Sequence, residues 1–350
     1  MNKLTPKITI GGESVVFFKG ALTSTGGLRA ASLQLTLPLK YAVEKKLWNK
    51  EVLFYIDEKN SSPLFRGYVK RIKETLTEVE IIAQDSLGYL VLGGSADKAI
   101  IALTDKENLD GLTVGNAIRK AISMANLDSK IGTDFISDTT PIASSSRPPL
   151  RGTMSVLDII KDLIGRAIDD SGALPRPNII KLMDDGSKSQ LVIELESDLD
   201  TASVVQEFSE EENILAIKII NKKVPTVIVV NGKNKVKGKY THTTAREALD
   251  SNYLEVTNQA LESPAACKDF AQKIFRANLQ TQYEYGIDTV DGYYLNENDV
   301  IHIKTNEKEY SGNYRVRGKK IAFTTGGLTI GLNINRKPPT LAEYIARQDS

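Results

Sequence analysis

The chain has 350 residues, enough for two or three hydrophobic cores, and its hydrophobic and charged fractions of 41% and 25% are ordinary for a globular protein. Its formal net charge of +1 provides no long-range field that would steer it to nucleic acid or to an anionic membrane. Cys267 is the only cysteine, which excludes an intrachain disulfide and a metal site built from several thiolates. The sequence shows no secretory signal and no spanning segment of ~20 apolar residues, so we expect synthesis in a cytoplasm without membrane insertion.

The first 92 residues carry the alternation typical of β-strands. Apolar runs around Ile8 and Val15 and the alternating Leu33, Leu35 and Leu37 predict short strands with one buried face. Paired glycines between these runs mark turns or bulges. Residues 1–92 are therefore predicted to form an all-β unit.

The middle of the chain changes to a helical period. One apolar stripe covers residues 114–125 and a second covers 156–167. The second helix begins at Ser155, whose hydroxyl is followed three residues later by an acid, as in a capping box. A hairpin is predicted for 178–195. We expect residues 93–200 to form a separate α+β domain.

Strands resume after residue 200. The segments 214–220 and 226–230 are β-branched, and Asn231 with Gly232 forms a hairpin-type turn after the second of them. These strands begin a second β unit, which is predicted to span residues 201–335.

Two helices are predicted in the last part of the chain. Ser263 and Pro264 provide an N-cap and a first helical position, so a helix is expected over 263–279 within the second β unit. Residues 336–350 form a C-terminal tail, in which 341–347 is predicted to be a short helix.

One strand pattern occurs twice, once near each end of the chain. Each copy has an apolar strand, a polar turn, a strand with a central glycine, and a final apolar run. The copies are 52–56, 65–69 and 79–82 near the N-terminus, and 300–303, 310–314 and 328–332 near the C-terminus. Gly67 and Gly312 are expected to hold equivalent places. The predicted fold class is α+β, mainly β, with two similar antiparallel β-barrels on either side of an α+β domain.

The histidines and the cysteine give no catalytic motif. His302 lies between two isoleucines of a strand and is expected on its polar face, and Cys267 lies among alanines of a helix, as a buried small hydrophobe does. His242 belongs to no recognised arrangement. No nucleophile elbow is present.

Two other segments fall short of a ligand site. Residues 232–239 miss the spacing of a phosphate-binding loop by one residue. Asp198 and Asp200 lack the glycine and glutamate of a Ca²⁺ loop, and Glu210 to Glu212 is typical of an exposed turn. We therefore expect no cofactor, no metal and no enzymatic activity.

The order of the segments resembles the baseplate hub of contractile-tailed bacteriophages, which is related to the N-terminal part of the type VI secretion spike. The segments that carry the resemblance are 33–38, 64–69 and 81–87 in the first β unit and 266–279, 295–300 and 312–316 in the second. The resemblance spans nearly the whole chain and depends on pattern, since no single motif is diagnostic.

The resemblance implies a structural role in a virion tail baseplate, assembled in the host cytoplasm. Such hubs are homotrimers in which two tube-protein-like barrels per chain make a pseudo-sixfold ring. The ring adapts the hexameric tail tube to the trimeric spike. The implied partners are a tube or distal tube protein and a spike protein, with baseplate wedge or sheath proteins as further candidates and DNA only as passing cargo.

Ring assembly is expected to use strand pairing and interface burial. The first strand of each repeat is expected to be a barrel edge that pairs with a neighbouring barrel. The candidate ring-interface residues are Val52, Phe54, Ile56, Gly67, Val300, Ile303, Gly312 and Tyr314.

Two other classes of function stay open. A tail-associated cell-wall hydrolase requires paired acids in a concave site, and 44 Asp and Glu residues allow many pairings. A receptor-binding or glycan-binding β protein requires aromatic side chains gathered on one face, and the aromatic content is only 7%.

Overall fold

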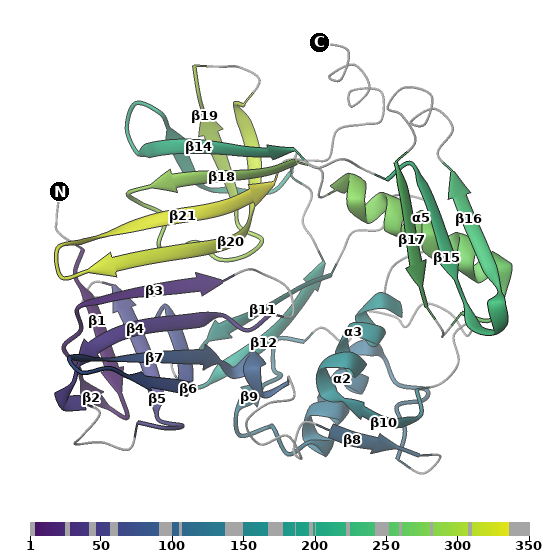
Figure 1. Cartoon of the computed structure of the whole chain (residues 1–350), viewed down its shortest axis with the longest axis horizontal. Coiled ribbons are helices and arrows are strands. Elements are labelled where there is room, and N and C mark those ends of the chain that lie inside the picture. The colour runs from purple at the N-terminus through teal and green to yellow at the C-terminus, as the bar shows by residue number, and fades with distance from the viewer. Residues whose placement is uncertain are drawn as a thin grey trace.

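The computed structural model describes residues 4–24, 29–41, 47–56, 62–90, 100–104, 107–136, 150–166, 178–185, 187–195, 199, 201–221, 225–241, 252–258, 261–280, 283–306 and 310–335. In these residues a 13-stranded sheet is accompanied by three smaller sheets and by three α-helices (Figure 1). The expected fold class, α+β and mainly β, is confirmed.

The first half of the large sheet, here called the N-terminal module, is formed by strands from the first 85 residues. In spatial order they are β3 (Lys19–Ser24), β4 (Ser32–Pro38), β7 (Glu78–Asp85), β6 (Phe65–Glu74), β5 (Glu51–Ile56), β1 (Pro6–Ile10) and β2 (Glu13–Ser14). Leu33, Leu35 and Leu37 of β4 are fully buried, so the predicted alternation of that strand is confirmed.

The second half, the C-terminal module, repeats this strand order. Its strands are β14 (Ile214–Asn221), β18 (Tyr283–Thr289), β21 (Gly327–Asn335), β20 (Gly312–Thr324), β19 (Val300–Lys304) and β13 (Val204–Ser209). One direction differs, because β13 runs parallel to β19 whereas β1 runs antiparallel to β5. Within the described residues no ladder joins β1 to β3 or β13 to β14, so closed barrels stay a prediction.

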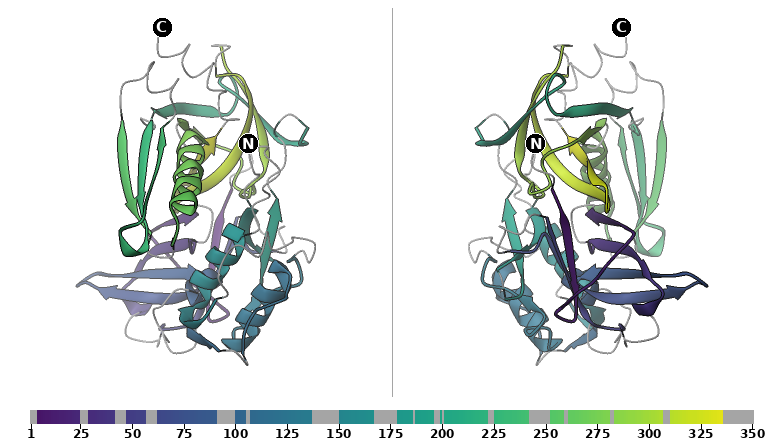
Figure 2. Two further views of the ribbon diagram at one scale, coloured as in Figure 1. Left: turned by 90° about the vertical axis from the view of Figure 1, so that its right-hand side faces the viewer. Right: turned by 90° about the vertical axis from the view of Figure 1, so that its left-hand side faces the viewer.

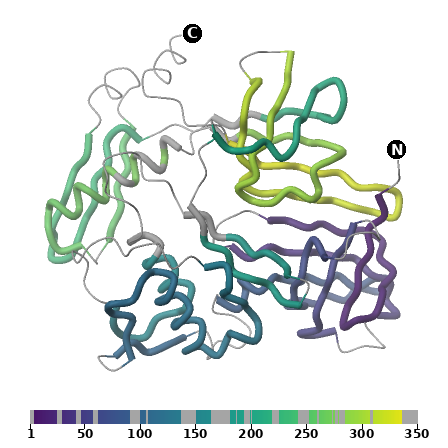
Figure 3. Tube along the Cα trace, turned by 180° about the vertical axis from the view of Figure 1, so that it is seen from behind, coloured from purple at the N-terminus to yellow at the C-terminus, as the bar shows by residue number. Residues whose placement is uncertain are grey.

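The two modules join through the long strand β20. Its first residues pair with β19, and residues 319–324 pair with β3 of the N-terminal module. Strands from the two ends of the chain therefore lie side by side, as Figure 3 shows in purple and yellow. Phe323 of β20 stacks on Phe54 of β5 with ring centroids 4.6 Å apart, so both modules share one hydrophobic core.

A second core belongs to the middle of the chain. Its elements are η1 (Ser86–Tyr89), β8 (Ile100–Leu103), α2 (Val114–Met124), β9 (Ile131–Gly132), β10 (Gly152–Ser155), α3 (Val156–Arg166), β11 (Asn178–Asp184) and β12 (Ser189–Leu195). Both helices and the hairpin β11–β12 were predicted and are confirmed. Ser155 accepts a hydrogen bond from the Asp158 backbone (3.1 Å) and donates one to its carboxylate (2.7 Å), which is the expected cap.

A third core is inserted between β14 and β18. It contains β15 (Val227–Asn231), η3 (Lys233–Lys235), β16 (Lys237–Thr241), β17 (Tyr253–Thr257) and α5 (Pro264–Gln280). The helix packs on one face of the three-stranded sheet (Figure 2), and Ser263 caps it by accepting from the Ala266 amide at 3.2 Å. The sequence predicted the helix and the turn after β15, but not that these segments have a core of their own.

Some predictions lie outside the described residues. These are His242, Asp198, Asp200 and the C-terminal helix over 341–347. The predicted boundaries at 92, 200 and 335 stay predictions.

Candidate assembly interface

Two asparagines identify equivalent positions in the two modules. Asn49 and Asn298 both have left-handed backbone conformations, with φ of 58° and 77°. The Asn49 amide donates to the Val69 carbonyl at 3.1 Å, and the Asn298 amide donates to the Val316 carbonyl at 3.0 Å. A shift of ladder register follows each valine. Val69 and Val316 are therefore counterparts.

This equivalence corrects the predicted alignment of the repeats. Gly67 of β6 lies opposite Val52 of β5, and the matching pair in the C-terminal module is Tyr314 opposite Ile301. Gly312 lies two residues earlier, opposite Ile303. The expectation that Gly67 and Gly312 are equivalent is wrong by two residues.

The offset arises because the two modules place a glycine and an aromatic residue in opposite order along the same face of the strand. In the N-terminal module the ring of Phe65 covers Gly67, where a Cβ atom would lie 2.4 Å from that ring and 2.4 Å from the Gln84 carbonyl oxygen. In the C-terminal module the glycine comes first and the ring of Tyr314 follows it. Each module accommodates one ring and one glycine, in opposite order.

The strands expected to be free edges are internal. Strand β5 lies between β1 and β6, and β19 lies between β13 and β20, so their backbone groups are paired within the chain. The large candidate side chains are all buried: Val52, Phe54, Ile56, Val300, Ile303 and Tyr314. The expectation of free edges at 52–56 and 300–303 is therefore wrong, because alternating apolar residues indicate burial without saying which neighbour buries them. Contact of these residues with another chain stays a prediction.

Other edges are open among the described residues. In that part of the chain β14 pairs only with β18, and residues 71–74 of β6 pair only with β7. Each of these edges carries an exposed leucine, Leu215 on β14 (61% exposed) and Leu76 at the tip of the β6–β7 hairpin (94% exposed). Neither edge was predicted from the sequence, although Leu76, an apolar residue between Thr75 and Thr77, was a usable signal.

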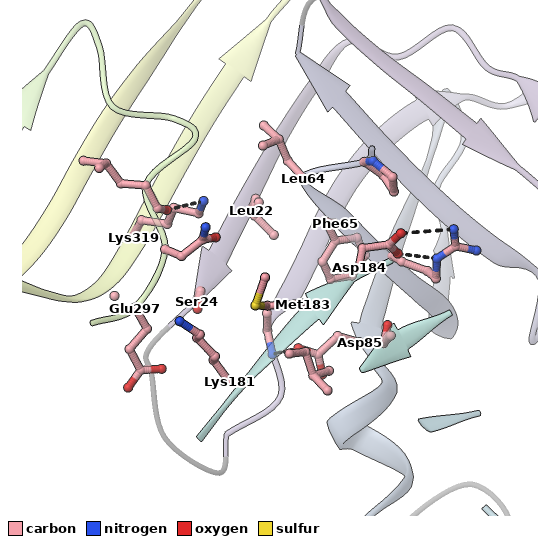
Figure 4. Close-up of a pocket in the computed structure, with 18 of the residues that line it drawn as sticks. Leu22, Ser24, Leu64, Phe65, Asp85, Lys181, Met183, Asp184, Glu297 and Lys319 are labelled. Atoms are coloured by element: carbon pink, nitrogen blue, oxygen red, sulfur yellow. Dashed lines mark hydrogen bonds and ion pairs between the residues drawn. The ribbon is translucent and has the colours of Figure 1, made fainter. Parts of the chain in front are cut away.

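A cavity of about 440 Å³ lies where both modules meet strand β11 (Figure 4). At its side, Arg66 of β6 binds Asp184 of β11 and also donates to Glu51 at 2.8 Å. Burial opposes the charge of Arg66, but its bonds to Asp184 and Glu51 outweigh this and raise its pKa. The pair connects the N-terminal module to the middle of the chain.

Two other buried ionisable groups line this cavity. Burial raises the pKa of Asp85 to about 7, although its carboxylate accepts backbone hydrogen bonds from Ala31 (2.9 Å) and Leu87 (3.0 Å). Burial lowers the pKa of Lys319 to about 8, and its ammonium donates to the carbonyls of Tyr293 and Leu295 at 2.9 and 2.7 Å. Both groups hold loops against strands.

The candidate nucleophile and base have structural contacts. Cys267 is buried in the third core, as expected. The Nδ1 atom of His302 lies 2.8 Å from Oδ1 of Asn313, its cross-strand neighbour. Across the described ranges, no three His, Cys, Asp or Glu residues are grouped to hold a metal ion. No helix in those ranges is long and apolar enough to cross a membrane.

The fold was compared with known proteins. No protein-family model matches the sequence, and no curated protein matches it. Among solved structures, the tail protein of Neisseria meningitidis MC58 is similar with a TM-score of 0.64 at 13% identity, over 95% of this chain and 97% of that one. The 43 kDa tail protein of prophage MuSo2 from Shewanella oneidensis has the same TM-score and coverage at 11% identity.

The chain has the fold of these tail proteins. An E. coli component of the type VI secretion system, described as structurally similar to the T4 tail proteins gp27 and gp5, is also similar, with a TM-score of 0.52 at 10% identity over 95% of this chain and 77% of that one. The resemblance drawn from the sequence is confirmed at the level of the fold.

Proposed function

We propose that this chain is a structural hub protein of a phage tail baseplate. Three copies form a ring of six modules, which adapts a sixfold tail tube to a threefold spike. The observation that carries the proposal is the repeated strand order of the two modules, joined side by side by the ladder between β20 and β3. One chain thereby supplies two similar units, so threefold symmetry generates six similar positions.

The face of the large sheet that points away from its core suits a channel wall. It carries polar side chains of both charge signs: Gln34, Glu80, Lys320, Thr324 and Asn333. Lys218 and Asp288, two oppositely charged residues on this face, form an ion pair at 2.6 Å. A wall with balanced charge lets DNA pass without binding it, which supports DNA as cargo rather than ligand.

The two ends of the ring have different partners. A tail tube or distal tube protein of sixfold symmetry contacts one end, and a trimeric spike contacts the other. The inserted unit and the middle of the chain remain available for wedge or sheath proteins. The virion tail baseplate is the site of action, after assembly in the host cytoplasm.

Sedimentation equilibrium together with electron microscopy of the purified chain tests the proposal. The expected particle is a trimer with six similar densities around its channel, formed alone at high concentration or with the spike protein. A stable hexameric ring of this chain alone would overturn the adaptor role, since it would contain twelve modules.

A further inference from the structure

In the described residues β20 and β3 join the two modules, and we infer that this junction repeats between neighbouring copies. Residues 72–75, which are the end of β6 and the first residue after it, pair with residues 218–221 of β14 of the next copy. This inference rests on the proposed trimeric ring and specifies how the ring closes. Within the chain, β20 of the C-terminal module binds β3 of the N-terminal module. Their counterparts are β6 and β14, and both have an open edge among the described residues.

The register follows from the equivalent positions. Because Val69 and Val316 are counterparts, Ile72 of β6 matches Lys319 of β20, and Thr75, the residue after β6, matches Ala322. Strand β14 matches β3 in the same way, through their ladders with β18 and β4.

When each residue pair of the β20–β3 ladder is replaced by its counterparts in β6 and β14, the result is an antiparallel pairing between copies. Ile72 lies opposite Asn221, and Thr75 lies opposite Lys218.

The exposed Leu76 supports this pairing. In the extended register Leu76 is opposite Ile217, and side chains directly opposite one another across a ladder are in contact. Leu215 lies in the irregularity of β14 between Ile214 and Ala216, so the regular alternation of faces does not extend to it. Leu76, 94% exposed in the single chain, would be covered by Ile217 of the next copy. Burial at the junction therefore explains an apolar side chain that the single chain leaves in water.

The junction inside the chain shows the same complementarity with different sizes. Phe323 lies over Gly20, where a Cβ atom would be 2.4 Å from the ring. The counterparts of this large and small pair are Leu76 and Ile217, two residues of intermediate size. Both pairs place apolar atoms at this point of the ladder, but Leu76 and Ile217 together are larger than Phe323 and Gly20, so the contact between copies would not repeat the internal one atom for atom.

Each copy has one edge of each kind, so the contact is head-to-tail. Such a contact closes into a ring when the rotation between copies divides a full turn. With two modules in each chain, closure at three copies gives six modules and leaves neither edge open.

Disulfide trapping in the full-length protein tests the register. The variant Thr75→Cys with Lys218→Cys is oxidised with copper phenanthroline and analysed by non-reducing electrophoresis. We expect covalent dimers and trimers, because residues directly opposite one another have Cβ atoms about 5 Å apart. The matched control, Thr75→Cys with Ala216→Cys, moves one thiol two residues along the same face and should react at most about one tenth as fast. Single-cysteine variants report any contribution from Cys267.

A surface variant tests Leu76 independently of thiol chemistry. Leu76→Asp changes an exposed side chain, so the protein should fold normally. It is expected to weaken self-association about tenfold or more, because it places a charge in a buried contact. Phe135→Asp changes an exposed side chain (53%) in the middle of the chain and should leave association unchanged.

The outcomes separate this inference from the proposed function. Trimers that form normally while the Thr75 and Lys218 pair reacts no faster than its control would overturn the pairing but keep the hub. Trimers unaffected by Leu76→Asp would do the same. A chain that stays monomeric at high concentration and with the spike protein, with no cross-link in any variant, would overturn both.

Discussion

Gly67 and Tyr314 occupy the same position in the two modules, opposite Val52 and Ile301. One has no side chain and the other has a buried ring that meets Tyr285 edge-on at 5.2 Å. The N-terminal module places its ring two residues earlier, at Phe65. The two modules therefore conserve the shape of the ladder while exchanging the side chains that fill it.

A side chain at Gly67 should damage the N-terminal module severely. In Gly67→Val the new Cβ atom would overlap the Phe65 ring and the Gln84 carbonyl oxygen, and the backbone oxygen cannot rotate away. We expect a loss of about 3 kcal/mol or more in the free energy of unfolding. Gly312→Val should cost about 1–3 kcal/mol for another reason, the strain of a β-branched residue at a φ of 142°. Denaturant unfolding of both variants measures the difference.

Gly327 provides the control for this comparison. It also lies in a strand, but no atom lies within 4 Å of its missing Cβ. Gly327→Ala should therefore change the free energy of unfolding by less than about 0.5 kcal/mol. Equal losses at Gly67 and Gly327 would contradict the close packing described here.

Local features of the fold could be predicted from the sequence. The caps at Ser155 and Ser263 were correct because their contacts span only three residues. The strand alternation was correct because burial of one face imposes a period of two. Both features depend only on residues that are close together in the sequence.

Long-range features could not be predicted. The two repeats align because the bond from the Asn298 amide to the Val316 carbonyl matches the bond from Asn49 to Val69. These bonds depend on how the hairpin strands pair, which the spacing of glycines does not reveal. The contact of Arg66 with Asp184 joins residues 118 positions apart, which no local pattern encodes. The open edges were missed for the same reason, since strand partners come from topology.

Asp85 should make stability depend on pH. Burial raises its pKa to about 7 in the folded chain, so between about pH 4 and 7 the folded state keeps a proton that the unfolded state has lost. The stabilisation is complete below the unfolded pKa and disappears as the pH rises through about 7. The free energy of unfolding should fall by a few kcal/mol over this range, on the order of 1–4.

Asp85→Asn isolates this contribution, because an amide does not titrate. The asparagine amide has one acceptor oxygen for the two backbone N–H groups of Ala31 and Leu87, because its NH₂ group cannot accept. The variant should therefore be less stable than the unmodified protein at acid pH, and its stability should vary less with pH. Chemical denaturation at several pH values gives both curves. Parallel curves for the two proteins would show that Asp85 titrates normally.

The bond between Arg66 and Asp184 should hold β11 against the N-terminal module. Both side chains are nearly buried, so Asp184→Ala removes a charged partner from a buried guanidinium that keeps its contact with Glu51. We expect a loss of about 1–3 kcal/mol and faster hydrogen exchange in β11 and β12. The exposed pair of Arg151 with Asp110 is the control, and Asp110→Ala should cost less than about 1 kcal/mol. Equal effects would show that burial of the Arg66 pair adds nothing.

The inserted unit should come apart without the modules when α5 is pushed from its sheet. A Cβ atom at Gly238 of β16 would lie 2.3 Å from the Lys268 nitrogen and 2.6 Å from the Cys267 carbonyl carbon, both in the helix backbone. Gly238→Ala must therefore displace the helix, at a cost of about 2–3 kcal/mol. Because β15, β16, β17 and α5 have their own core, hydrogen exchange should increase there and stay slow in β18 and β21. The control is Gly286→Ala in β18, where an added Cβ atom would lie 3.7 Å from its nearest neighbour and should change hydrogen exchange in neither region. Loss of protection throughout the chain in Gly238→Ala would show that the third core does not unfold independently.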